Sequence, residues 1–99
     1  MGYSKFVIRT FHCKKTERLW KRERVKDFES IEAVALRRLT ALDSAQALND
    51  LLTPPGHRLE ALRGDRQGQY SIRINDQYRV CFTWKEETAH DVEITKHYR

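Results

Sequence analysis

Four arginines in the C-terminal half of the chain are candidates for binding a phosphate group. Arg63 and Arg66 belong to a glycine-rich polar turn at residues 63–68, and Arg73 and Arg79 flank a short connection at matching offsets. The planar guanidinium fork of arginine matches two phosphate oxygens at once. We expect Arg73 and Arg79 to face each other across a hairpin, where two like charges destabilise a sheet unless an anion lies between them.

The same arginines could instead be neutralised within the fold. Three acidic residues are available for this, namely Asp65, Asp76 and Glu93. In that interpretation the arginines form ion pairs and bind no ligand. The residues alone leave both interpretations open.

The last four residues carry groups suited to proton transfer. The chain ends Lys96-His97-Tyr98-Arg99, and histidine is the side chain whose ordinary pKa lies nearest to neutral pH. An ordinary solvated terminus is the alternative, and composition alone favours it.

No metal or cofactor site is predicted. The four histidines and two cysteines never stand at the spacing of metal ligands, such as Cys-x-x-Cys or His-x-x-x-His. Neither a glycine-rich nucleotide-binding loop nor the nucleophile elbow of hydrolases is present. Cys13 and Cys81 fit no disulfide framework, and we interpret them as reduced thiols.

Composition indicates one domain with a polyanionic partner. The 99 residues are 39% hydrophobic and 33% charged, which suits one core under an ionic surface. The formal net charge is +5, and residues 1–28 hold nine Lys and Arg against three Asp and Glu. Small basic domains rich in arginine most often bind nucleic acid. A solvated surface without a partner is the alternative.

Membrane and secretory segments are not predicted. The longest unbroken apolar run is residues 33–36, against the roughly 20 residues that span a bilayer. Residues 6–8 are followed directly by Arg9, which leaves no apolar segment of a secretory signal. We therefore expect a cytoplasmic protein with no membrane partner.

The elements that must position these residues follow from the apolar periodicity, which changes at residues 53–56. Before that point we predict a strand over residues 4–11 and helices over 13–25, 30–42 and 45–52. After it, alternation predicts strands over 58–62, 69–74, 78–84 and 92–98.

These elements predict an α+β fold. Short turns between the late strands imply antiparallel pairing, and the helices must cover one face of the sheet. We expect one domain over residues 1–99, with an N-terminal strand and two to three helices packed on an antiparallel sheet of about four to five strands. The open face would carry Arg73, Arg79 and Lys96.

Segments spread over nearly the whole chain share one family resemblance. They are PPGHRLEALRGDRQG at 54–68, YSIRIN at 70–75, QYRVCF at 77–82, VEIT at 92–95 with His97 and Tyr98, and ALDSA at 41–45 and LNDL at 48–51 in the helical half. The set closely resembles the HigB-type toxins of the RelE/ParE superfamily of toxin–antitoxin systems. The resemblance implies a RelE-like fold.

The resemblance also implies an activity and partners. HigB-like proteins are mRNA interferases, which cut mRNA in the A site of the small ribosomal subunit during translation. The reaction needs no metal, because the ribose 2′-hydroxyl attacks the adjacent phosphate and expels the 5′-oxygen. A HigA-like helix-turn-helix antitoxin neutralises such a toxin, and operator DNA is bound only through the antitoxin complex.

Carried over by position, the resemblance assigns roles to the arginines. Arg79 matches the strand arginine that contacts the scissile phosphate, where a preorganised fork would stabilise the charge of the transition state. Arg63 matches a basic residue suited to an adjacent phosphate. We place Arg58, Arg66 and Arg73 in the same RNA-binding set.

The C-terminal end departs from the family pattern. Many members close with Asp-Tyr-His, whereas this chain has Lys96 in the acidic position and His97 and Tyr98 in the reverse order. His97 is the best general acid or base, and Tyr98 would stack on a base or assist. Glu60 stands where some members have a histidine; it is either a base or the partner of an arginine, and we favour the second.

Two other functions stay open beside the nuclease. ParE-like members share the fold but bind DNA gyrase, and they need neither the matched arginine nor a terminal histidine. A non-catalytic RNA-binding module is the third possibility, which the lysine at position 96 keeps open. In the nuclease interpretation, the basic residues 1–28 would contact ribosomal RNA through salt-sensitive interactions.

Overall fold

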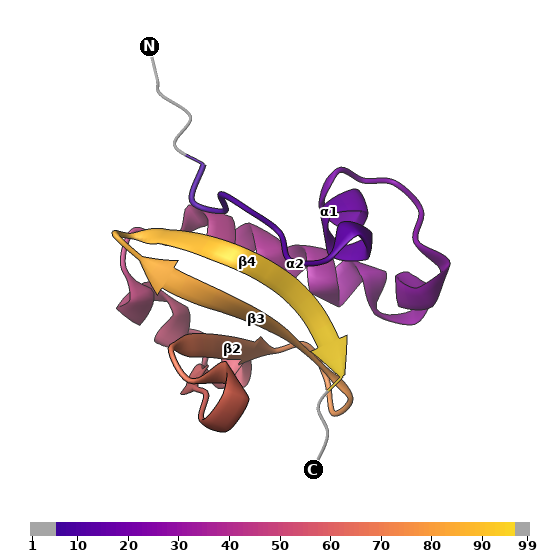
Figure 1. The fold of residues 1–99 in the computed structure, drawn as a ribbon. Helices are drawn as coiled ribbons and strands as arrows, with labels where there is room; N and C mark the ends of the chain where they lie inside the picture. Colours follow the sequence, from indigo (N-terminus) through magenta and orange to yellow (C-terminus); the bar gives the residue numbers. More distant parts are fainter. Residues whose placement is uncertain (1–5, 97–99) are drawn as a thin grey trace.

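The sheet that carries the candidate residues has four antiparallel strands in sequence order, and Figure 1 labels the second, third and fourth of them. The computed structural model describes residues 6–96. Its strands are β1 Glu60–Ala61, β2 Gln69–Arg73, β3 Tyr78–Lys85 and β4 Thr88–Lys96. Each strand pairs with the next along the chain. The predicted antiparallel meander and the predicted α+β class are therefore confirmed.

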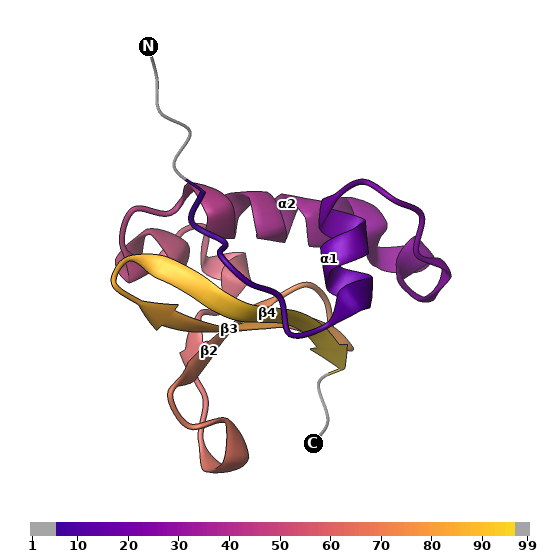
Figure 2. The same cartoon turned by 45° about the horizontal axis from the view of Figure 1, so that its top comes forward.

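Helices cover one face of this sheet. The α-helices are α1 Lys14–Trp20 and α2 Glu32–Ser44, and 3₁₀ helices occupy Lys26–Ile31 (η1), Leu48–Leu52 (η2), Pro55–His57 (η3) and Gly64–Arg66 (η4). Figure 2 shows α1 and α2 on one side of the sheet and the turn around η4 projecting from the other. No helix in the described part of the chain is long and apolar enough to cross a membrane.

The core lies between α2 and the helix-facing side of the sheet. Leu39 and Leu42 of α2 are fully buried, as are Ile72, Val80 and Phe82 of the central strands. The helix predicted over residues 30–42 is confirmed, although α2 begins two residues later because η1 precedes it. Burial of these side chains fixes which face of β2 and β3 is left for the arginines.

The predicted N-terminal strand is wrong. Residues 6–11 form two isolated parallel bridges with β4, in which Ile8 meets Ala89 and Phe11 meets Val92. Val7 and Ile8 are both buried, so the expected alternation fails. The carboxylate of Asp43, near the end of α2, accepts hydrogen bonds from the backbone N–H groups of Val7 (3.0 Å) and Ile8 (2.9 Å). This long-range capture holds the segment between helix and sheet.

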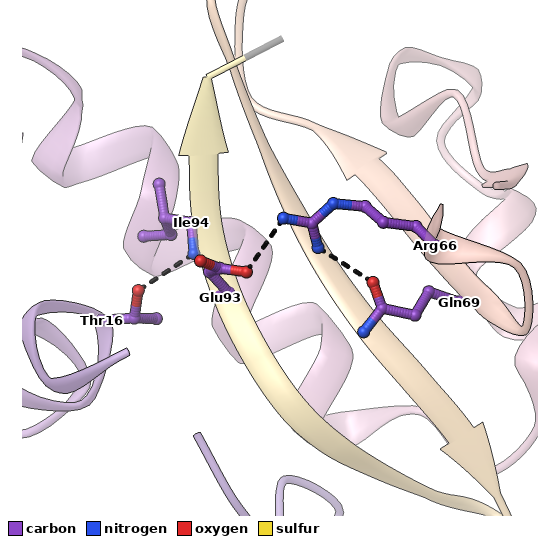
Figure 3. A network of polar contacts seen from close by, with 5 residues as sticks. All are labelled: Thr16, Arg66, Gln69, Glu93 and Ile94. Carbon is purple, nitrogen blue, oxygen red and sulfur yellow. Dashed lines mark hydrogen bonds and ion pairs between the residues drawn. The ribbon is translucent and has the colours of Figure 1, made fainter. Parts of the chain in front are cut away.

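Side chains close the outer edge of β4. The N–H of Ile94 donates to the buried hydroxyl of Thr16 at 3.0 Å, as Figure 3 shows. The N–H of Asp91 donates to the hydroxyl of Thr10 at 2.8 Å. These contacts satisfy backbone donors that an edge strand otherwise exposes, and the Thr16 contact fixes β4 against α1.

Candidate active site

The hairpin of β2 and β3 places two candidate arginines side by side. In its register Arg73 lies directly opposite Arg79, which confirms the predicted pairing. Both side chains leave the face of the sheet opposite to the one that packs on the helices, because Ile72 and Val80 take the core side. The two positive charges therefore meet on the same face.

A groove of about 610 Å³ gathers four of the predicted residues. Its lining consists of Arg58, Glu60, Ser71, Arg73, Asn75, Asp76, Tyr78 and Arg79. The residues come from the end of η3, from β1, and from the β2–β3 hairpin with its connecting turn. A groove that is rich in arginine and has polar neighbours can hold a phosphate group of an extended chain.

Arg79 is the arginine best prepared to bind an anion in this groove. It is half-buried, and its Nε is fully buried with no hydrogen-bond partner among the described residues. It forms no ion pair within residues 6–96. A buried donor left unsatisfied costs roughly 1–3 kcal/mol, and an anionic oxygen at Nε would remove that cost.

Arg73 is partly neutralised. Its guanidinium pairs with Asp76, three residues further along the chain. Its carbonyl oxygen accepts a hydrogen bond from Nε of Arg38 at 2.7 Å, which ties α2 to the end of β2. Burial is the main cause that lowers the pKa of Arg38, and Arg37 and Arg73 add to it. Local neutralisation thus holds for Arg73 but not for Arg79.

The turn arginines lie away from this groove. Arg66 pairs with Glu93 of β4 at 3.2 Å and donates to Oε1 of Gln69 at 2.9 Å (Figure 3). Arg63 is exposed at the start of η4 and is not part of the lining. The four arginines therefore do not form one cluster, and Arg66 is the second arginine that an acidic residue neutralises.

Arg58 and Glu60 enter the groove from the segment that precedes the hairpin. Arg58 ends η3 with φ of +45°, in the left-handed region, and its side chain is exposed. Glu60 of β1 lies opposite Ser71 of β2. Within residues 6–96 Glu60 forms no ion pair with an arginine, so the favoured interpretation of Glu60 as an arginine's partner gains no support from the structure.

Lys96 lies on the other face of the sheet, and its predicted place beside Arg73 and Arg79 is wrong. The register pairs it with Tyr78, and its ammonium lies 6.0 Å from the centroid of that ring. Its position has the same parity as Ile94, which faces the core. His97 and Tyr98, the expected acid–base pair, lie outside the described residues.

Four residues of the lining were not among the predicted site residues, namely Ser71, Asn75, Asp76 and Tyr78. Tyr78 lines the groove at the start of β3, while its half-buried ring lies on the core side of the sheet, where it meets Phe28 edge-on at 6.3 Å. Oδ1 of Asn75 accepts hydrogen bonds from the N–H groups of Gln77 and Tyr78, both at 2.8 Å. The tight connection predicted at residues 75–77 is therefore confirmed, whereas its place in the groove lining was not foreseen.

The described residues hold no metal-binding cluster. Nowhere in residues 6–96 do three or more His, Cys, Asp or Glu side chains gather so that they could bind a metal ion. The residues that line the groove thus supply guanidinium groups and the carboxylates of Glu60 and Asp76.

Comparison with known proteins identifies the family. A family of RelE-like toxins of type II toxin–antitoxin systems, the HigB-like toxins, matches residues 9–97. Toxin HigB-1 of Vibrio cholerae serotype O1 is 46% identical over 68 residues, which are 69% of this chain and 72% of that toxin.

Solved structures share the fold at low sequence identity. A YoeB-YefM complex from Staphylococcus aureus matches with a TM-score of 0.60 at 19% identity, over 92% of this chain and 98% of that one. A YoeB/ParE toxin from Agrobacterium tumefaciens matches with a TM-score of 0.52 at 21% identity, over 95% and 99% of the two chains. The family match and the close relative together show that this chain belongs to the HigB-like toxins of type II toxin–antitoxin systems.

Proposed function

We propose that this toxin is a ribosome-dependent mRNA endonuclease whose groove binds the phosphate that is cut. The RNA supplies the nucleophile, because its 2′-hydroxyl attacks the adjacent phosphorus and the 5′-oxygen leaves. The protein then has to position the RNA, stabilise the extra negative charge on the phosphate oxygens, and move two protons. None of these tasks requires a metal ion.

The unpaired Arg79 carries this proposal. Its buried Nε lacks a partner among residues 6–96, and Arg73 lies opposite it with the same charge. Both features make the empty groove less stable than an anion-bound groove. The guanidinium fork would bind the phosphate more tightly as charge builds up in the transition state.

The remaining roles follow from position. Arg58 lines the groove and would hold a neighbouring phosphate, and Arg63 would contact the chain beyond it. Glu60, which enters the groove without an arginine partner in the described part of the chain, is a candidate base. His97 and Tyr98, which lie outside the described residues, are the other acid–base candidate pair. Lys96 would contact the Tyr78 ring and would not contact the phosphate.

The basic N-terminal end supports only a modest contact with ribosomal RNA. Four of its cations are neutralised in ion pairs, which are Lys15 with Asp27, Arg18 with Glu23, Lys21 with Glu17 and Arg24 with Glu29. Among residues 6–28, Arg9, Lys14, Arg22 and Lys26 form no ion pair with another described residue, and Arg22 lies over the Trp20 ring. We propose these four as the docking cations, and the expected dependence on salt is correspondingly shallow.

A HigA-like helix-turn-helix antitoxin is the proposed partner that silences the toxin. Membership in a family of toxin–antitoxin systems supports an antitoxin in general. In this proposal operator DNA is bound only by the toxin–antitoxin complex, and the toxin acts in the cytoplasm.

Expression of the toxin without antitoxin tests the proposal in cells. We expect growth arrest together with new mRNA 5′ ends in frame with codons, and both should vanish in Arg79→Ala. Arg37→Ala, which removes an exposed arginine of α2 outside the groove, is the matched control and should stay toxic. Arrest with intact mRNA and inhibited gyrase supercoiling would establish the ParE-like alternative. Normal growth would establish a non-catalytic module.

A further inference from the structure

We propose that Arg66 is a positioning residue, which binds the Glu93 carboxylate and so keeps Arg79 free for the phosphate. This inference rests on the proposed nuclease function. Arg66 then has a role other than RNA binding, and Glu93 belongs to the site through its ion pair with Arg66.

The register brings the groups within reach of one another. Cys81 of β3 pairs with Glu93 of β4, and Arg79 stands two residues before Cys81 on the same face. Glu93 and Arg79 are therefore diagonal neighbours across two paired strands, a separation of about 7–8 Å between such residues that long side chains can bridge. In the structure Glu93 nevertheless pairs with Arg66 at 3.2 Å.

The pKa of the Cys81 thiol is affected by burial and by the charges of Arg79, Arg66 and Glu93. Burial raises the pKa of this thiol, and the positive charges of Arg79 and Arg66 oppose the shift while Glu93 adds to it. All three charged groups thus act on one sulfur atom beneath them. Whichever arginine holds Glu93, the other remains available.

Arg66 is held in place from both sides. Nη1 donates to Oε1 of Gln69 at the start of β2, and Nη2 donates to Oε1 of Glu93 (Figure 3). The side chains of Arg66 and Glu93 are 35% and 21% exposed, so this pair is better shielded than an ordinary surface ion pair. Gln69 therefore presets the guanidinium to meet the carboxylate.

Loss of Arg66 would leave the shielded Glu93 carboxylate without its cation. The other guanidinium near it on this face is that of Arg79, whose Nε has no partner among the described residues. A carboxylate on Arg79 would occupy the donors that the phosphate needs and cancel the charge that stabilises the transition state. The chemical step should slow even though Arg66 never touches RNA.

A double-mutant cycle measures this coupling. Single-turnover mRNA cleavage on programmed ribosomes is compared for wild type, Arg66→Ala, Glu93→Gln and the double variant, with Arg37→Ala as the charge-matched control. We expect Arg66→Ala to slow cleavage about tenfold in the wild-type background and less than about twofold in the Glu93→Gln background. Urea unfolding of each variant corrects for any loss of folded protein.

Equal losses in both backgrounds, or no loss from Arg66→Ala, would overturn the inference. Equal losses would assign Arg66 to direct RNA contact or to holding the turn. A second measurement is independent of cleavage: the NMR resonance of the Arg79 Nε–H should shift in Arg66→Ala and return in the double variant. If wild type leaves mRNA intact, the nuclease proposal fails, and this resonance still decides whether Glu93 moves to Arg79.

Discussion

At the scale of single residues, the site depends on which arginines lack a carboxylate. Arg73 and Arg66 are paired with Asp76 and Glu93, and Arg79 is not paired within the described residues. Net charge therefore says little about function here, whereas the arrangement of charge singles out one residue. Phosphate binding should depend on Arg79 far more than on its equally charged neighbour.

This contrast predicts unequal effects of two matched substitutions. Arg79→Ala should slow cleavage by about 100- to 1,000-fold, the usual effect of losing a donor to transition-state charge, whereas Arg73→Ala should slow it by less than about tenfold. Single-turnover cleavage on programmed ribosomes measures both. Arg79→Lys should resemble Arg79→Ala, because a point charge cannot replace the fork. Equal losses at positions 73 and 79 would contradict the assignment.

At the scale of elements, side chains from the helical half fix the strands that carry the site. Thr16 of α1 accepts from β4, Asp43 of α2 binds the N-terminal segment, and Arg38 of α2 binds the end of β2. Each contact joins residues far apart in sequence. The hairpin is thus held directly by Arg38, and the neighbouring strand β4 and the N-terminal segment are held by Thr16 and Asp43.

Loss of the Thr16 hydroxyl should loosen β4. Thr16→Val keeps the shape of the side chain but leaves the N–H of Ile94 without its acceptor, which should lower the free energy of unfolding by about 1–3 kcal/mol. Urea denaturation followed by circular dichroism measures the change. Thr40→Val, at an exposed position on α2, is the control. A loss no greater than that of the control would show that this hydrogen bond does not stabilise the fold.

The parts of the structure that local patterns determine were predictable. Alternation predicted strands at 69–74 and 78–84, and the observed strands are Gln69–Arg73 and Tyr78–Lys85. The prediction of an N-terminal strand failed because the carboxylate of Asp43, far away in the sequence, accepts hydrogen bonds from the backbone N–H groups there. The face of Lys96 was within reach of sequence reasoning, since it shares its parity with Val92 and Ile94.

The site was predictable in part, for the same reason. Its central pair, Arg73 and Arg79, is predictable because the two residues stand at equal sequence distances on either side of one turn. The sequence does not show that Arg66 is paired while Arg79 lacks a carboxylate partner among the described residues. The reason is that Glu93 and its partner Arg66 are 27 positions apart in the sequence. Tyr78 was missed because the first residue of a strand can line a groove beside the turn even though its ring packs against the core.

At the scale of the whole molecule, one buried histidine links stability to pH. His57 is buried, and its Nδ1 lies 3.3 Å from the carbonyl oxygen of Leu51. Burial lowers its pKa below the ordinary value of 6.5, the Leu51 carbonyl opposes the shift, and Arg38 adds to it. The folded protein therefore holds this ring neutral where the unfolded chain begins to protonate it.

The sign of the pH dependence follows from this depressed pKa. Below about pH 6.5 the unfolded chain binds a proton that the folded protein rejects, so the free energy of unfolding should fall, by up to about 1.4 kcal/mol for each pH unit, until the lowered pKa is reached. Urea midpoints between pH 7.5 and 5.5 measure the slope. His57→Gln should flatten it, with the exposed His12→Gln as control. An unchanged slope in His57→Gln would assign the effect to other groups.

Cleavage by the purified toxin on ribosomes programmed with a defined mRNA tests the central claim most directly. Primer extension should show a cut at the codon in the A site with wild type, and no cut with Arg79→Ala at the same concentration of folded protein. Intact mRNA with the folded wild-type toxin, or equal cutting by Arg79→Ala, would contradict the assignment of the groove as a phosphate-binding nuclease site.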